Sequence, residues 1–285
     1  MAFLFGGEKN HFLTTEFFFL KKYIKYFFYV LGFSRLWDQL IFRMAQIRLR
    51  KQNSFYLNQH PGTLLPDDYD LHETFQLDYR KYIEEGKLAA AEIQSDTQAL
   101  FRDAGPNTLL DWGCGTGRIT RHLQQVFPGA TLYGGDTNTR RMEWNRTHNE
   151  GIHFTTLLPF PPTPFASDFF DLIIGFSVLT HIDNDSQDVW IAELYRILKP
   201  GGILWFTTQG EVYTRQLLDF EKRKLHTKGI YTRSGNRPGH RMMTTYHYAP
   251  LFREYLSRYF SVRHFYSGKT HPSKTGGQDV WIVQK

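Results

Sequence analysis

The sequence predicts an α/β protein in which a doubly wound, mainly parallel sheet follows a helical N-terminal extension. From about residue 107, short apolar runs alternate with helical segments, which is typical of such a sheet. A glycine-rich loop follows the first of these runs, where open α/β sheets bind ligands. The last two apolar runs are joined by a glycine- and lysine-containing loop, and they predict a terminal antiparallel hairpin.

Composition and cysteine content limit the class of protein. The 285 residues are 41% hydrophobic and 22% charged, which excludes global disorder. No run of about 18 uncharged apolar residues occurs, so a conventional membrane-spanning helix is not expected. The single cysteine, Cys114, excludes an intramolecular disulfide and a multi-cysteine zinc site. These features favour a cytoplasmic protein.

The positive charge is concentrated at the N-terminus. Residues 1–52 hold nine of the 34 basic and three of the 28 acidic residues, which leaves 25 of each downstream. Apolar residues from Leu13 to Leu31 recur at steps of three and four, and Lys21, Lys22 and Lys25 share another face. We interpret 1–52 as a basic, aromatic, amphipathic helical extension. It predicts peripheral contact with an anionic membrane surface, at the inner face, or packing on a protein partner or on its own domain.

Residues 53–104 form a second region, which we interpret as a helical cap or linker. Turn sequences at His60-Pro61-Gly62 and Pro66-Asp67-Asp68 open it, and an alanine-rich helix is predicted over 87–102. Its aromatic residues Phe75, Tyr79 and Tyr82 either stack on an acceptor or belong to the core.

Residues 105–285 carry the predicted sheet. The expected elements, in chain order, are strands at 108–111, 131–136, 152–155, 170–176 and 203–207, helices at 118–127, after Asn138, at 185–198 and at 250–258, and hairpin strands at 260–266 and 279–283. An irregular stretch, 229–245, separates the fifth strand from the hairpin and is a candidate lid over the substrate.

The loop Asp111-Trp-Gly113-Cys114-Gly115-Thr-Gly117 is the most informative segment. Alternate glycines let the backbone approach a ligand, and the amides at the following helix favour an anionic group. The spacing differs from the Gly-x-Gly-x-x-Gly of hydride-transferring dinucleotide enzymes. The early carboxylate of Asp111 favours a cationic amino group instead. A ligand with a carboxylate, an ammonium, a sulfonium and a nucleoside fits this pattern.

Over roughly residues 87–285 the sequence resembles the class I S-adenosylmethionine-dependent methyltransferases. The loop is the strongest match, and later landmarks follow in register at Asp136, Pro164-Phe165, 177–182 and 194–202. The resemblance implies a Rossmann-like sheet of strand order 3-2-1-4-5-7-6 and S-adenosylmethionine as cofactor, with S-adenosylhomocysteine as product. It implies that Asp111, Gly113, Gly115 and Gly117 surround the methionine part and that Asp136, with Thr137 beside it, binds the ribose. Leu157 lies where the family contacts adenine, Phe176 and Ser177 would lie below the sulfonium, and Cys114 would be a small filler of the loop.

Methyl transfer needs an aligned nucleophile and, for a hydroxyl, a base. The candidate bases are His181, directly after the fourth strand, and His247, after the candidate lid. No carboxylate or histidine cluster with metal spacing stands out, so metal independence is expected.

We therefore predict a methyltransferase whose acceptor is a small molecule, a saccharide or a glycolipid, and we favour a hydroxyl as the methylated group. Nucleic acid is an unlikely partner, because charges balance beyond residue 52. The alternatives are a catalytically inactive cofactor-binding partner subunit and, less favoured, a nucleotide-dependent oxidoreductase.

Overall fold

The computed structural model describes residues 33–101, 105–233, 243–271 and 275–285. The predicted helix at 13–31 and the middle of the candidate lid lie outside these ranges. The chain divides into two compact units, Met1–Met44 and Ala45–Lys285. Helix α2 (Ser34–Gln59) runs through the predicted boundary at residue 52, which stays a prediction.

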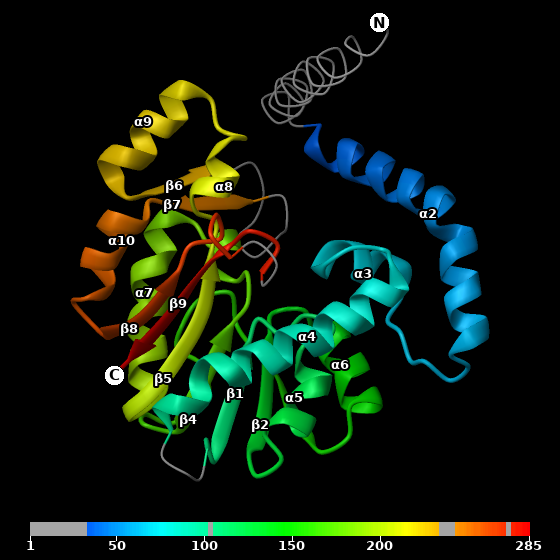
Figure 1. Cartoon of the computed structure of the whole chain (residues 1–285), viewed down its shortest axis with the longest axis horizontal. Helices are drawn as coiled ribbons and strands as arrows, with labels where there is room; N and C mark the ends of the chain where they lie inside the picture. Colours follow the sequence, from blue (N-terminus) through cyan, green and yellow to red (C-terminus); the bar gives the residue numbers. More distant parts are fainter. Residues whose placement is uncertain (1–32, 102–104, 234–242, 272–274) are drawn as a thin grey trace, which may run out of the picture. The chain divides into compact units, whose positions relative to one another are not determined.

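The larger unit is built on a seven-stranded sheet (Figure 1). Its strand order is β3-β2-β1-β4-β5-β9-β8, which confirms the predicted order, with β8 and β9 as the terminal hairpin. The first five strands pair in parallel, and β9 is antiparallel to both β5 and β8. The strands are β1 (Thr108–Trp112), β2 (Thr131–Asp136), β3 (Ile152–Thr156), β4 (Phe170–Gly175), β5 (Leu198–Thr208), β8 (Ser261–Tyr266) and β9 (Asp279–Gln284).

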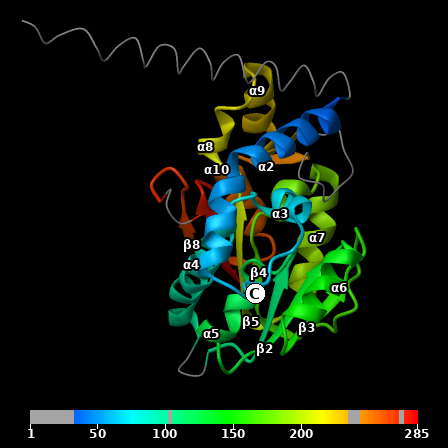
Figure 2. The same ribbon diagram turned by 90° about the vertical axis from the view of Figure 1, so that its right-hand side faces the viewer.

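Successive residues of the central strands alternate between two hydrophobic layers, as the pleat of a strand requires. Leu109 packs on one face with residues of α4 (Tyr79–Thr97) and α5 (Thr120–Val126). Leu110 packs on the other face with residues of α7 (Asn184–Ile197) and α10 (Ala249–Leu256). The two views show helices covering both sides of the sheet (Figures 1 and 2). This double covering explains why the parallel strands read as continuous apolar runs.

Side-chain caps set the starts of several helices. Asp78 accepts a hydrogen bond from the Lys81 amide at 3.1 Å, so α4 begins at Tyr79 and not at residue 87. Asn138 caps α6 (Thr139–His148), and Asp183 caps α7 through the Ser186 amide at 2.8 Å. Asp67 caps the short helix α3 (Asp68–Thr74). Helices α8 (Glu211–Thr214) and α9 (Asp219–Lys228) follow β5.

The ends of the predicted irregular stretch are ordered strands, so this expectation was wrong there. Strand β6 (Ile230–Arg233) pairs antiparallel with β7 (Thr244–His247), from Ile230 opposite His247 to Arg233 opposite Thr244. Arg233 is buried in an ion pair with Glu221 of α9, which neutralises its charge. Segments rich in β-branched and aromatic residues thus form a two-stranded ribbon that is anchored to α9.

Candidate functional site

The glycine loop lies between β1 and α5, folded back on the end of β2. The amides of Gly113 and Cys114 both donate to the Gly135 carbonyl oxygen, at 2.7 and 3.1 Å, and the Gly117 amide donates to the Cys114 carbonyl oxygen at 2.9 Å. The three glycines have positive φ angles of 74°, 54° and 74°. This left-handed backbone favours glycine and turns successive amides into a cradle.

Close packing requires glycine at two of these positions as well. A Cβ at Gly113 would lie 2.4 Å from Cγ2 of Val178, the residue after Ser177. A Cβ at Gly117 would lie 2.6 Å from Oδ1 of Asn145 in α6. Nδ2 of the Asn145 side chain also donates to the Gly115 carbonyl oxygen at 2.9 Å. The loop is therefore held between the end of β4 and helix α6.

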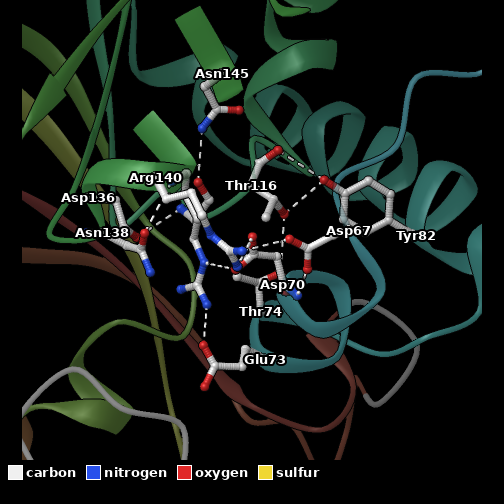
Figure 3. Close-up of polar contacts among 12 residues, drawn as sticks. Asp67, Asp70, Glu73, Thr74, Tyr82, Thr116, Asp136, Asn138, Arg140 and Asn145 are labelled. Atoms are coloured by element: carbon white, nitrogen blue, oxygen red, sulfur yellow. Dashed lines mark hydrogen bonds and ion pairs between the residues drawn. The ribbon is translucent and has the colours of Figure 1, made fainter. Parts of the chain in front are cut away.

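Asp136, at the end of β2, is joined to the loop (Figure 3). Its Oδ2 accepts from the Gly115 amide at 3.0 Å, and its Oδ1 accepts from the Asn138 amide at 2.9 Å. The neighbouring predicted residues also gather here: the Leu157 amide donates to the Asp136 carbonyl oxygen at 2.9 Å, while Thr137 is exposed. Leu157 is buried against Gly135, and Cys114 is buried against Met142 and Phe154. The role of Cys114 as a filler of the loop stays a prediction.

Asp111 is a buried acid at the end of β1. It is 3% exposed, and its Oδ2 accepts a hydrogen bond from the Thr120 hydroxyl at 2.5 Å. Burial raises the pKa of Asp111 to about 7, and the charge of Asp136 adds to this rise, while Thr120 and Arg118 oppose it. A carboxylate in this position is stabilised by a bound cation, which is what the predicted ammonium group would supply.

Residues of the second region contact the glycine loop, while its role as a cap over the acceptor stays a prediction. The Tyr82 hydroxyl of α4 donates to the Thr116 carbonyl oxygen at 3.0 Å, and Thr74 of α3 lies 3.1 Å from Thr116, oxygen to oxygen (Figure 3). Tyr82 is fully buried, so it belongs to the core. The Tyr79 hydroxyl donates to the Asp68 carboxylate at 2.6 Å. The Phe75 ring lies against the Arg118 guanidinium, with 4.3 Å between the ring centre and Cζ of Arg118.

A clamp of charges holds α3 against α6, and the sequence analysis missed it. Arg141 contacts Asp70 at 2.9 Å and also pairs with Glu73. Arg140 contacts Asp70 at 2.7 Å and Asp67 at 2.9 Å (Figure 3). Burial lowers the pKa of Arg141, but the carboxylates around it, including Asp136, outweigh burial and raise it. The acids recur every three residues, which was a signal that α3 has a charged face. Their partners lie some 70 residues away and could not be read from that spacing.

Arg118 is a second residue that sequence reasoning missed. Its guanidinium lies 4.3 Å from the centre of the Phe75 ring and 5.1 Å from that of Phe176. Phe176 in turn stacks on Trp205 at 5.9 Å. Since both rings stabilise a cation on their faces, Arg118 is held between the cap and the end of β4, close to Asp111.

The two candidate bases occupy different environments. His181 is half-buried after β4, and its Nδ1 lies 2.8 Å from the Met243 carbonyl oxygen. His247 is 1% exposed, its Nε2 contacts Gln187 at 3.0 Å, and its ring lies against Phe252. Burial lowers the pKa of His247 to about 3. The role of His247 as a base stays a prediction, and this core placement argues against it.

Within the ranges that the structure describes, no group of three or more His, Cys, Asp or Glu residues is arranged to hold a metal ion. Among the helices of those same ranges, none is both long and apolar enough to span a bilayer.

Comparison with known proteins agrees with this geometry. A family model described as "Methyltransferase domain" matches residues 110–206, which contain the loop, β2, β4 and most of β5. The family model and the relatives named below support a class I S-adenosylmethionine-dependent methyltransferase domain, and S-adenosylmethionine is the cofactor of this class.

Particular relatives can also be named. The chain is 28% identical over 132 residues to a malonyl-[acyl-carrier protein] O-methyltransferase of Hahella chejuensis, covering 46% of each chain. It is 33% identical over 102 residues to a ubiquinone/menaquinone biosynthesis C-methyltransferase of Desulfotalea psychrophila, covering 35% of this chain and 40% of that protein. The match thus spans less than half the length of these relatives. A solved structure from Listeria monocytogenes, described as an S-adenosylmethionine-dependent methyltransferase, shows the same fold, with a TM-score of 0.51 and 16% identity over 69% of this chain and 99% of that one.

Proposed function

We propose that the protein transfers a methyl group from S-adenosylmethionine to an oxygen atom of a small-molecule or lipid-linked acceptor. One observation carries this proposal: the buried acid Asp111, which accepts a hydrogen bond from Thr120, lies at the end of β1 directly before a left-handed glycine loop that is hydrogen-bonded to Asp136. Asp111 would hold the ammonium group, the loop amides the carboxylate, and Asp136 the ribose. Leu157 would border the adenine, and Phe176 and Ser177 the sulfonium.

The chain would contribute alignment and proton removal, because the sulfonium already supplies an activated carbon. His181 is our candidate base. A carbonyl oxygen can only accept a hydrogen bond, so Nδ1 of His181 carries a proton in its contact with Met243. In the neutral ring Nε2 then carries the lone pair that can take a proton.

The acceptor class is supported by two observations. The named relatives act on a malonyl group carried by a protein and in quinone biosynthesis, according to their descriptions. Beyond residue 52 the chain has equal numbers of basic and acidic residues, which does not favour a nucleic acid. A saccharide or glycolipid hydroxyl is compatible with the same arrangement.

Isothermal titration calorimetry tests the cofactor part. We expect heat with S-adenosylmethionine and S-adenosylhomocysteine and none with a nicotinamide dinucleotide, and the reverse would favour an oxidoreductase. Asp136→Ala should weaken cofactor binding by about 1.5–3 kcal/mol for each charge-assisted hydrogen bond lost. Asp219→Ala, which changes an exposed acid of α9, is the control. Cofactor binding without transfer to any acceptor in a cell extract would favour the inactive partner subunit.

We further propose that residues 1–52 bind an anionic membrane surface. In the first unit, Leu36, Leu40 and Met44 recur every four residues on α2 and are 59%, 52% and 58% exposed. Arg35 and Arg43 lie beside them in the sequence, so apolar and cationic groups are combined as an anionic interface requires.

Co-sedimentation with phosphatidylserine-containing vesicles tests the membrane proposal. Binding should weaken as salt is raised and should be lost when Leu36, Leu40 and Met44 are all changed to Gln. The control is Leu158→Gln, at a leucine of the other unit that is 67% exposed. If the triple variant sedimented with the vesicles as well as the wild type, the membrane proposal would be contradicted.

A further inference from the structure

A closed group of polar side chains joins the ends of β4, β5 and β9. The Ser177 amide donates to the Thr207 hydroxyl at 2.8 Å, and that hydroxyl donates to Oε1 of Gln278 at 2.5 Å. Nε2 of Gln278 donates to the Ser177 hydroxyl oxygen at 2.9 Å. A fourth member, Thr180, contacts the same hydroxyl at 2.9 Å. We call Ser177, Thr180, Thr207 and Gln278 the Ser177 network.

The protons of this network can be assigned from the contacts alone. Thr180 donates its only hydroxyl proton to the backbone oxygen of Ser177, at 2.6 Å. In the contact between the two hydroxyls, Ser177 is therefore the donor, and its own proton is used. The Ser177 oxygen has two lone pairs, and Gln278 occupies one of them. One acceptor position is left on Ser177 and no donor.

If the side-chain amide of Gln278 had its nitrogen and oxygen exchanged, the Ser177 hydroxyl would again have no proton left to donate to a ligand. If the amide were reversed, Ser177 would still find an acceptor for its proton inside the network, now in Gln278. The Thr207 hydroxyl would then lose the acceptor of its own proton, although Thr207 is fully buried. A buried hydroxyl without an acceptor is costly, so the first orientation is favoured.

Only one of these four side chains is open to solvent. Thr180 and Thr207 are fully buried and Gln278 is 8% exposed, while Ser177 is half-buried. Ser177 also has a φ of 61°, a left-handed conformation that is unusual for a residue other than glycine and that collects at functional sites. The next residue, Val178, packs against Gly113 of the cofactor loop. The remaining acceptor position of Ser177 therefore belongs to a half-buried residue that adjoins the proposed cofactor site.

We infer that Ser177 recognises the acceptor by accepting a hydrogen bond from it, and that Gln278 is the positioning residue that aims Ser177. This inference rests on the proposed function and narrows it to a neutral hydroxyl as the methylated group. A hydroxyl group can donate to the Ser177 oxygen and still offer a lone pair to the methyl carbon. An ionised carboxylate has no proton to donate and would meet a lone pair there.

The reaction then balances without a further reactant. The bond from sulfur to the methyl carbon breaks, the bond from the acceptor oxygen to that carbon forms, and the sulfur keeps the electron pair as S-adenosylhomocysteine. Until the bond forms, the hydroxyl proton points to the Ser177 oxygen, which orients the hydroxyl; once the oxygen is methylated and positively charged, this proton passes to a base, for which His181 is the candidate. The product is a methyl ether, whereas a carboxylate acceptor would yield a methyl ester.

The full-length protein, tritium-labelled S-adenosylmethionine and a cell extract as the acceptor source test the inference. We expect label that survives mild alkali and is released as methyl iodide by hydriodic acid, as an ether requires. Label released as methanol by mild alkali, label that resists both treatments, or no transfer although the cofactor binds would each overturn the inference. Loss of cofactor binding itself would instead overturn the proposed function.

A matched pair of variants tests the positioning role. Gln278→Glu keeps the shape of the side chain and removes the donor to Ser177. We expect it to raise the half-saturating amount of the extract fraction about five- to tenfold, while affinity for S-adenosylmethionine stays within about twofold. The control is Gln284→Glu, the same change at the other end of β9, where the side chain donates to the Gly201 carbonyl oxygen. An unchanged half-saturating amount in Gln278→Glu would refute the role.

A second variant covers the case in which Gln278→Glu does not fold. Thr180→Val removes the group that holds the Ser177 proton, so Ser177 regains a donor. We expect alkali-labile label to appear with this variant, while Thr180→Ser should resemble the wild type. An unchanged ratio of alkali-labile to alkali-stable label in Thr180→Val would contradict the inference.

Discussion

The buried carboxyl group of Asp111 should cost the cofactor-free protein stability while it serves cofactor binding. Asp111→Asn replaces it with a neutral group of the same shape that can still accept the hydrogen bond from Thr120. We expect two opposite effects: the variant is more stable than the wild type at pH 8, and it binds S-adenosylmethionine more weakly. A residue that served packing alone would not separate these effects.

The magnitude follows from the pKa of Asp111, which burial raises from 3.8 to about 7. At about 1.36 kcal/mol for each pH unit, this shift corresponds to at most about 4 kcal/mol. Because the folded protein holds the proton more tightly than the unfolded chain, the stabilising contribution is complete below about pH 4. It is lost as the pH rises to about 7. The neutral asparagine has no such dependence.

Urea unfolding of the cofactor-free protein between pH 4 and pH 8 measures this effect. The free energy of unfolding of the wild type should fall over this window relative to that of Asp111→Asn. Calorimetry at pH 8 should show about 10- to 100-fold weaker S-adenosylmethionine binding by the variant, as expected for the loss of one charge-assisted contact.

Asp279 provides the matched control for this experiment. Burial raises its pKa from 3.8 to about 6, and it accepts a hydrogen bond from the Gly268 amide at 2.9 Å, outside the loop. Asp279→Asn should flatten the pH dependence in the same direction, by at most about 3 kcal/mol, and leave cofactor affinity within about twofold. If Asp111→Asn lost stability with pH as steeply as the wild type, or bound the cofactor equally well, our reasoning about Asp111 would be refuted.

Two further predictions concern the clamp and the loop. Arg141→Gln should lower the free energy of unfolding by about 3 kcal/mol, because it removes a largely buried arginine that pairs with Glu73 and is one of the two arginines in contact with Asp70. Arg140→Gln, at a side chain 61% exposed, should cost less than about 1 kcal/mol, and similar losses in urea unfolding would contradict the assignment of burial. Gly117→Ala should lower the free energy of unfolding by at least about 2 kcal/mol and weaken cofactor binding, because the added Cβ combines a φ of 74° with a contact of 2.6 Å to Asn145. Gly129→Ala, where nothing lies within 4 Å of the added Cβ, should leave the melting temperature and the cofactor affinity nearly unchanged.

Much of the larger unit was predictable from local patterns. Buried parallel strands read as apolar runs, and the Asp111-to-Gly117 loop combines a carboxylate with alternate glycines, so strand positions and the cofactor loop followed from short stretches of sequence. The ribbon of β6 and β7 was missed, because its two strands are short and pair across residues 234–242. Arg233 of this ribbon can be buried because Glu221, on helix α9, neutralises its charge.

The histidines illustrate the same limit. His181 and His247 carried similar signals in the sequence, since each follows a strand or a candidate lid near the expected ligand edge. The structure places His181 half-buried against the Met243 carbonyl oxygen and His247 in the core against Phe252. Burial, and with it the pKa of an imidazole, is set by neighbours that are distant in the chain.

The sequence by itself determined the class of fold and the position of the glycine loop that we propose holds the cofactor, because periodicity and glycine spacing act over a few consecutive residues. The tertiary structure alone decided which distant side chains meet: Arg141 with Asp70 and Glu73 over the loop, and Gln278 with Ser177 beside it, which are 101 residues apart. Such pairs leave no periodic trace, because their geometry exists only once the folded chain has brought distant helices and strand ends together.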